Sequence, residues 1–191
     1  MKLLFTTLLA ALSCFAYAED NWQTMENNYK FEGDTYGVEL RTYADDDYDH
    51  VEFTSKLSSN LKAAVRIAED GETTEYRPKL THKVLKKGPF SFAHRLEYRY
   101  FEGPKDDNAR YRWIAKLNAG GLWLTAQPRW EFGHGKTGDA KVDSVKWQTG
   151  FDLPLATNVT LTPFAEYLTA GEDGKWQKEH LIGGTTLKVK F

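Results

Sequence analysis

The segment FSFAHRLEYRY, residues 90–100, constrains the fold of this chain more than any other stretch. Every second residue is large, and all of these except His94 are apolar or aromatic. Three of the residues between them, Arg95, Glu97 and Arg99, are charged. Successive side chains of a β-strand point to opposite faces, so the segment predicts a strand with one aromatic and one charged face. A soluble sheet can contain such a strand. A transmembrane β-barrel requires it, because lipid covers one face and water the other.

The same alternation recurs in ten segments along the chain. They span residues 36–42, 51–57, 61–67, 76–84, 90–100, 109–117, 122–132, 145–153, 159–167 and 181–191. Polar connections at 44–48, 69–73, 102–108, 133–141 and 169–175 alternate with shorter turns at 58–60, 86–89, 119–121 and 154–158. Long loops at one end and short turns at the other are typical of bacterial outer-membrane barrels.

These patterns predict an all-β fold. We expect a closed antiparallel transmembrane β-barrel of about ten strands, or alternatively twelve. An even strand number would leave both chain ends on the periplasmic side. The sheet should close on itself, because a bilayer tolerates no open sheet edge.

The first 18 residues are typical of a secretory signal peptide. Lys2 precedes an apolar run at 3–12, and Ala16-Tyr17-Ala18 fits the small-x-small cleavage pattern. Cys14, the only cysteine, lies inside this peptide, so residues 19–191 form one barrel domain without disulfides. Residues 19–31 precede the first clear segment and could be a periplasmic tail, a plug or an extra strand.

The remaining sequence contains no candidate membrane helix. After the signal peptide no run approaches the roughly 20 apolar residues that such a helix needs, and mean hydropathy is −0.59. The last residue, Phe191, follows an alternating strand and resembles the terminal signal of outer-membrane proteins. It predicts contact with the barrel-insertion machinery, and the expected location is the outer membrane of a Gram-negative bacterium, in contact with lipid and lipopolysaccharide.

The charged faces of the predicted strands are mainly basic. By alternation, basic residues pointing inward outnumber acidic ones by roughly two to one, and this ratio depends on the register of each strand. The proposed outer loops are acidic, so the net charge of −2 hides a basic lumen beneath acidic loops. Rings of Arg and Lys are typical of anion-selective pores. The candidate substrate path consists of Arg77, Lys79, Arg95, Arg99, Arg110, Arg112, Lys116 and Arg129.

Several patches resemble the oligogalacturonate-specific porin family. They are YGVELRTYADDDYD at the first strand and loop, HRLEYRY and LTAQPRWEF in the middle, and LKVKF at the end. The resemblance implies a small monomeric outer-membrane barrel that passes acidic oligosaccharides, with lumen arginines at Arg95, Arg99 and Arg129. Members of the family typically have twelve strands, and the chain departs from this by a strand pair that is missing between Leu153 and Thr160.

Other functions remain open from the sequence. A barrel of ten to twelve strands should hold a narrow channel, but its charges could instead pair and fill it, giving a non-conducting structural or adhesive barrel. A soluble β-sandwich or lipocalin-like carrier is a further alternative. An enzyme is not favoured, because the five histidines are scattered, His82 and His94 should face outward, and only His134 could lie at a rim. We expect no cofactor, no metal site and no nucleic-acid partner.

Overall fold

The computed structural model describes residues 24–44, 48–133, 142–172 and 175–191. The predicted signal peptide and His134 lie outside these residues. The strands are β1 (Thr24–Glu32), β2 (Tyr36–Tyr43), β3 (Tyr48–Lys56), β4 (Leu61–Asp70), β5 (Thr73–Lys87), β6 (Phe90–Glu102), β7 (Asn108–Ala119), β8 (Leu122–Gly133), β9 (Ser144–Phe151), β10 (Leu153–Ala156), β11 (Val159–Glu172) and β12 (Lys175–Lys190). Among the described residues, none belongs to a helix that is long and apolar enough to span a membrane.

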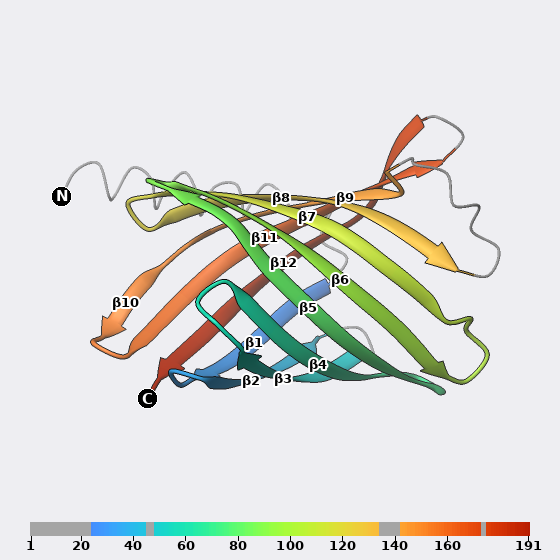
Figure 1. The fold of residues 1–191 in the computed structure, drawn as a ribbon, viewed down its shortest axis with the longest axis horizontal. Helices are drawn as coiled ribbons and strands as arrows, with labels where there is room; N and C mark the ends of the chain where they lie inside the picture. Colours follow the sequence, from blue (N-terminus) through green and yellow to red (C-terminus); the bar gives the residue numbers. More distant parts are fainter. Residues whose placement is uncertain (1–23, 45–47, 134–141, 173–174) are drawn as a thin grey trace.

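The strands form one sheet that closes into a barrel (Figure 1). Consecutive strands from β1 to β9 pair antiparallel, and β11 pairs with both β9 and β12. The short β10 continues the line of β9 past Asp152, since Gly150 pairs with Phe164 and Leu153 pairs with Leu161 on the same strand, β11. The closed circuit therefore has eleven strands, with β10 as a short addition.

The structure has twelve strands in all, eleven of them in the closed circuit, so the predicted alternative of twelve agrees better than about ten. All ten predicted segments are strands, and the eleventh is β1, within the segment that the sequence left open as a tail, plug or strand. Its alternation is weak because Asn27 occupies an outward position, but Met25, Tyr29 and Phe31 are exposed whereas Glu26 and Asn28 are buried. The strand pair that appeared to be missing after Leu153 is not needed, because β9 closes directly on β11.

The odd number also differs from the even number that was expected to bring the start of the first strand and the end of the last strand to the same side. An odd closed barrel needs one parallel pair, and here β1 runs parallel to β12, with Glu32 opposite Lys190. The start of β1 therefore lies at the end of the barrel opposite Phe191. The short turns, such as 88–89 and 120–121, and the C-terminus share one end, and the connection 103–107 lies at the other (Figure 1). We call these the turn end and the loop end. The connection predicted at 69–73 is only a tight turn of two residues, Gly71 and Glu72. Gly71 has a positive φ of 58°.

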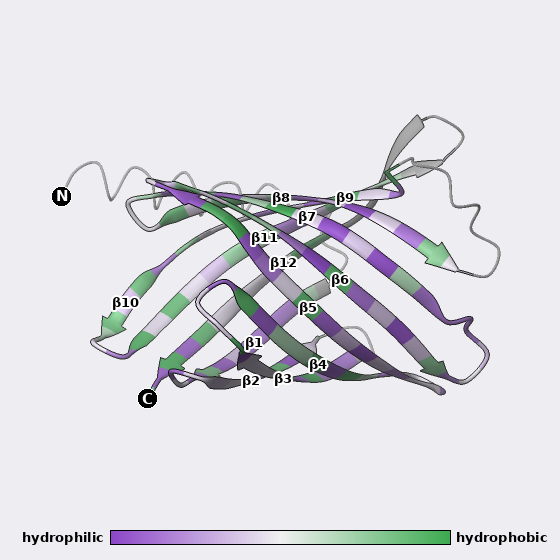
Figure 2. Ribbon diagram, viewed as in Figure 1, coloured by the Kyte–Doolittle hydropathy of each residue, from purple (hydrophilic) through white to green (hydrophobic). Residues whose placement is uncertain are grey.

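Hydrophilic and hydrophobic residues alternate along the strands, as the coloured bands in Figure 2 show. Their distribution is the reverse of that in a soluble domain. Glu26, Glu75 and Glu97 are the largest fully buried side chains. In contrast, Phe53 is 50% exposed and Leu96 is 56% exposed. A single closed sheet excludes a β-sandwich, and a charged interior does not suit an apolar-ligand carrier of the lipocalin type.

Two aromatic rings pack over glycines on the inner wall. A Cβ on Gly150 would lie 2.6 Å from Cζ2 of Trp123, and a Cβ on Gly184 would lie 2.6 Å from Cζ of Phe164. Trp123 pairs with Gly150 across β8 and β9, and Phe164 pairs with Gly184 across β11 and β12. The missing side chains let the rings lie against the wall, so that they take little space from the interior.

Candidate functional site: the charged barrel interior

The barrel encloses a cavity of about 440 Å³. Its basic lining residues are Lys30, Arg41, Lys62, Arg66, Arg77, Lys79, Arg95, Arg110, Arg112, Lys116, Arg129 and Lys146. Its acidic lining residues are Glu26, Glu39, Glu52, Glu97 and Glu166. The twelve basic and five acidic side chains give the lining a formal charge of +7. The excess of basic residues that alternation predicted is therefore present around the cavity.

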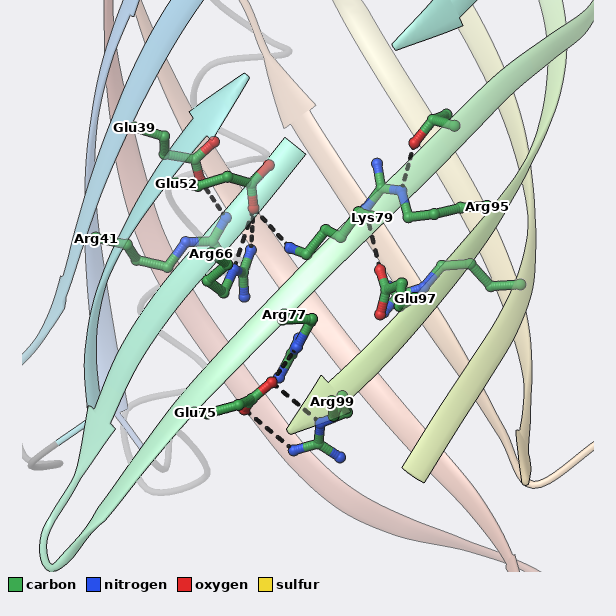
Figure 3. Close-up of polar contacts among 12 residues, drawn as sticks. Glu39, Arg41, Glu52, Arg66, Glu75, Arg77, Lys79, Arg95, Glu97 and Arg99 are labelled. Atoms are coloured by element: carbon green, nitrogen blue, oxygen red, sulfur yellow. Dashed lines mark hydrogen bonds and ion pairs between the residues drawn. The ribbon is translucent and has the colours of Figure 1, made fainter. Parts of the chain in front are cut away.

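Seven of the eight predicted path residues line this cavity. The exception is Arg99, which lies on the inner face of β6 and binds Glu75 of β5, with 3.2 Å between Arg99 Nε and Glu75 Oε1. Arg77 also binds Glu75, donating from Nη2 to Oε2 at 2.7 Å (Figure 3). Glu75 therefore holds two arginines, and Arg99 is better described as part of a wall contact than as a lining residue.

A second carboxylate, Glu52 on β3, also forms ion pairs with two cationic side chains. Lys79 Nζ lies 2.6 Å from Glu52 Oε2, and Arg66 donates to the same oxygen from Nε at 3.1 Å and from Nη2 at 3.0 Å. Figure 3 shows Glu52 between these two side chains. Such charge-assisted hydrogen bonds fix the direction of long side chains that would otherwise fill the interior.

Glu97 on β6 begins a longer network. It accepts from Arg112 Nη2 at 2.6 Å and forms an ion pair with Arg95 at 3.5 Å. Arg112 also donates to Gln127, Gln127 donates to Gln148 at 2.9 Å, and Gln148 donates to Glu166 at 2.8 Å. The chain of contacts crosses β6, β7, β8, β9 and β11 and ends at the ion pair between Glu166 and Lys146.

All of these contacts follow the wall. Each joins residues of one strand, of neighbouring strands or, for Glu52 and Lys79, of strands two apart. On β1 and β2, next to β3, Arg41 binds Glu39 and Glu26, and Lys30 binds Glu39 at 3.0 Å. The paired side chains are thus drawn toward the sheet, and the cavity lies between them.

Three lining cations have no carboxylate partner among the described residues: Lys62, Lys116 and Arg129. Arg129 is only 8% exposed, and its Nε is buried without a hydrogen-bond partner. It lies opposite Arg112 across β7 and β8. Because this guanidinium lines the cavity and forms no ion pair within the described residues, it is suited to bind an anion from outside the protein.

The turn end of the cavity carries an aromatic side chain that the sequence analysis did not single out. Trp123, the second residue of β8, lines the cavity, and Lys116 Nζ lies 4.8 Å from the centroid of its ring. The indole Nε1 donates to Asp152 Oδ1 at 3.3 Å, and Thr162 donates to the same oxygen at 2.7 Å. Its inward position does follow from alternation, but the aromatic residues were read mainly as outward.

The N-terminal part of the lining was also missed. Glu26, Asn28 and Lys30 of β1 all line the cavity. The signal that could have found them is the outward set of Met25, Tyr29 and Phe31 with polar residues between.

The described histidines form no recognisable catalytic or metal arrangement. His82 and His94 lie on the outer face, as predicted, with His82 Nδ1 3.1 Å from His94 Nε2. Within the described ranges, no group of three or more His, Cys, Asp or Glu residues could hold a metal ion.

Comparison with known proteins adds little beyond this geometry. No family model matches the chain, and no curated protein matches it. Among solved structures, it is similar to a BenF-like porin from Pseudomonas fluorescens Pf-5, with a TM-score of 0.33 and 10% sequence identity. The match covers 75% of this chain and 51% of the porin chain. The resemblance to the oligogalacturonate-specific porin family stays a prediction.

Proposed function

We propose that this chain is an outer-membrane porin with a narrow basic lumen, through which anionic oligosaccharides of the uronate type diffuse. The observation that carries the proposal is the composition of the cavity lining, which contains twelve basic and five acidic side chains. The remaining features of the barrel agree with this function.

An outer-membrane location is supported by the outer face. Large apolar and aromatic side chains are exposed there, among them Tyr36, Leu40, Leu80, Trp113 and Trp147. In water this surface would be an aggregation hazard, but in a bilayer it meets lipid, and Trp and Tyr suit the interface. Lipid and lipopolysaccharide are therefore the proposed surroundings, with Phe191 as the contact for the insertion machinery and the monomer as the working unit.

Anion preference follows from electrostatics. A narrow channel with low-dielectric walls focuses the field of its lining charges and concentrates ions of the opposite sign. Arginine binds carboxylates well, because its planar guanidinium can donate two parallel hydrogen bonds. The proposed path consists of the seven predicted residues that line the cavity, with Arg99 stabilising the wall. Arg129 would be the strongest point of contact, since it lines the cavity and forms no ion pair within the described residues, unlike Arg110 and Arg112.

Substrate size is limited by the barrel. Eleven strands lie between the side-chain-filled barrels of eight strands and the open pores of sixteen. An extended oligosaccharide fits a channel of this class, whereas a folded macromolecule does not. Uronate units carry one carboxylate each, so a chain of them could move between successive weak sites.

Reversal potentials of the pure protein in planar bilayers test the proposal. We expect anion preference in a KCl gradient, and we expect it to fall in the double variant Arg95→Gln, Arg129→Gln, since both residues line the cavity. Lys56→Gln is the control, because Lys56 is exposed and bonds the backbone carbonyl of Asp34 at 2.8 Å rather than lining the cavity. Cation preference in the wild-type protein would refute the basic-lumen argument.

The alternative is a non-conducting structural or adhesive outer-membrane barrel. The many ion pairs along the wall favour it, because paired charges can also fill a barrel for stability. The two functions differ in one measurement. Absence of channel events from correctly folded, heat-modifiable protein would reject the porin and support the alternative.

A further inference from the structure

We infer that Trp123 and Lys116 form a binding subsite for one ring of a sugar acid at the turn end of the lumen. This inference rests on the proposed function and deepens it, because it selects cyclic sugar acids over other anions. The subsite consists of a fixed indole ring beside an ammonium group that forms no ion pair within the described residues.

The indole of Trp123 is held in place on two sides. Behind it lies Gly150, which has no side chain to push the ring into the lumen. Its edge is tied to the Asp152 carboxylate, which Thr162 also holds. A ring fixed in this way loses little freedom when a ligand packs on it, and binding is then stronger for the same contact area.

The inner surface of the indole can accept a sugar ring. Trp123 lines the cavity, whereas Trp113 and Trp147 are exposed on the outer face. An aromatic ring has a negative π-face, and the C–H bonds on one side of a pyranose ring carry a partial positive charge, so the two surfaces attract. An acyclic anion offers no such flat surface.

Lys116 supplies the charge for the carboxylate. In the free barrel its ammonium lies over the indole at 4.8 Å, a cation–π contact. Within the described residues it has no ion pair, and its four-carbon side chain can swing aside. When a uronate ring packs on the indole, the ammonium can move to the ring carboxylate. The indole ring of Trp123 and the ammonium group of Lys116 would then bind two different parts of one sugar unit.

Single-channel residence times test this inference with two blockers of similar charge. Trigalacturonate carries three ring carboxylates, and citrate carries three carboxylates without a ring. For Trp123→Leu we expect the trigalacturonate residence time to shorten by about three- to tenfold, the range that an aromatic contact supports. The citrate residence time should stay unchanged. Trp147→Leu, on the outer face, is the matched control and should alter neither.

Two further variants keep the result interpretable. Trp123→Phe retains a smaller ring and should give an intermediate residence time even if the leucine variant folds poorly. Lys116→Gln should shorten the residence times of both blockers. Equal shortening for both blockers in Trp123→Leu, or no change in either, would overturn the subsite. Reversal potentials in KCl separate the two proposals: anion preference without ring preference rejects only the subsite, whereas cation preference or no channel rejects both.

Discussion

The two ends of the barrel interior differ in how many of their basic side chains form ion pairs. Toward the loop end, Arg77 and Arg99 share Glu75, and Arg110 pairs with Glu131. Toward the turn end, Lys62 and Lys116 line the same cavity without a carboxylate partner among the described residues. Arg129, the third such cation, lies in the loop half, opposite Ser144 at the start of β9. Arginine suits the paired half because its planar group binds carboxylates in two places, whereas lysine is a hydrated point charge on a flexible stem.

This difference separates two roles of the same charge. A paired arginine fixes the wall, and removing its partner leaves an uncompensated buried charge. An unpaired lysine contributes little to stability, but its whole charge acts on ions in the channel. Stability should therefore depend on the paired arginines of the loop half, and ion selectivity should respond strongly to Lys62 and Lys116 in the turn half and to the unpaired Arg129.

The largest expected effect is on stability in the loop half. Glu75→Gln removes the carboxylate that holds two arginines, one of them, Arg77, only 6% exposed. We expect a loss of about 3 kcal/mol in the free energy of unfolding, as for other broken buried ion pairs. Urea unfolding in detergent micelles measures it. Lys62→Gln is the matched variant and should change stability by less than about 0.5 kcal/mol. Equal losses would contradict the division into two halves.

A smaller effect is expected from filling the space at the two wall glycines. In Gly184→Ala the new Cβ would lie 2.4 Å from the backbone oxygen of Glu26, and this rigid contact should cost about 1–3 kcal/mol. In Gly150→Ala the closest contact is the ring of Trp123 at 2.6 Å, and the closest backbone atom, the oxygen of Pro163, lies farther away, at 2.9 Å. Unfolding midpoints should therefore fall further for Gly184→Ala. The reverse order would show that the wall beside β1 is looser than the structure indicates.

Ion selectivity should distinguish two neighbouring lysines. Lys62 lines the cavity, and Lys56, its register partner on β3, is exposed and bonds a turn carbonyl. A unit charge about 8 Å from an ion contributes roughly 0.5–2 kcal/mol. Lys62→Gln should therefore lower the anion-to-cation permeability ratio by about two- to tenfold, as measured by reversal potential. Lys62→Arg should preserve it, and Lys56→Gln should change it little.

The smallest effect concerns salt. The screening length falls from about 10 Å at 0.1 M to about 3 Å at 1 M. The difference in selectivity between the wild type and Lys62→Gln should therefore nearly disappear in 1 M KCl. The stability difference caused by Glu75→Gln should persist, because buried pairs are screened much less. Loss of both differences at high salt would show that Glu75 is more accessible to water than its 2% exposure indicates.

Much of the barrel could be predicted from alternation alone. The ten segments are all strands, and their outward and inward faces are as expected, because a period of two assigns each side chain to one face. All eight arginines of the chain occur at inward positions. The sequence did not decide whether β1 is a strand, because Asn27 interrupts its outward apolar residues. Trp123 was overlooked, although alternation predicts that it points inward.

The sequence by itself determined which face of each strand is charged and that the inner face is basic. Only the tertiary structure decided how many strands close the barrel, and that β1 runs parallel to β12. It also decided which charges are paired, as Glu52 with Lys79 two strands away, and which, like Lys62, are not. The physical reason is that alternation is local to one strand. Closure, register and ion pairing depend on which strands become neighbours and at what offset, and side chains far apart in the chain settle these together.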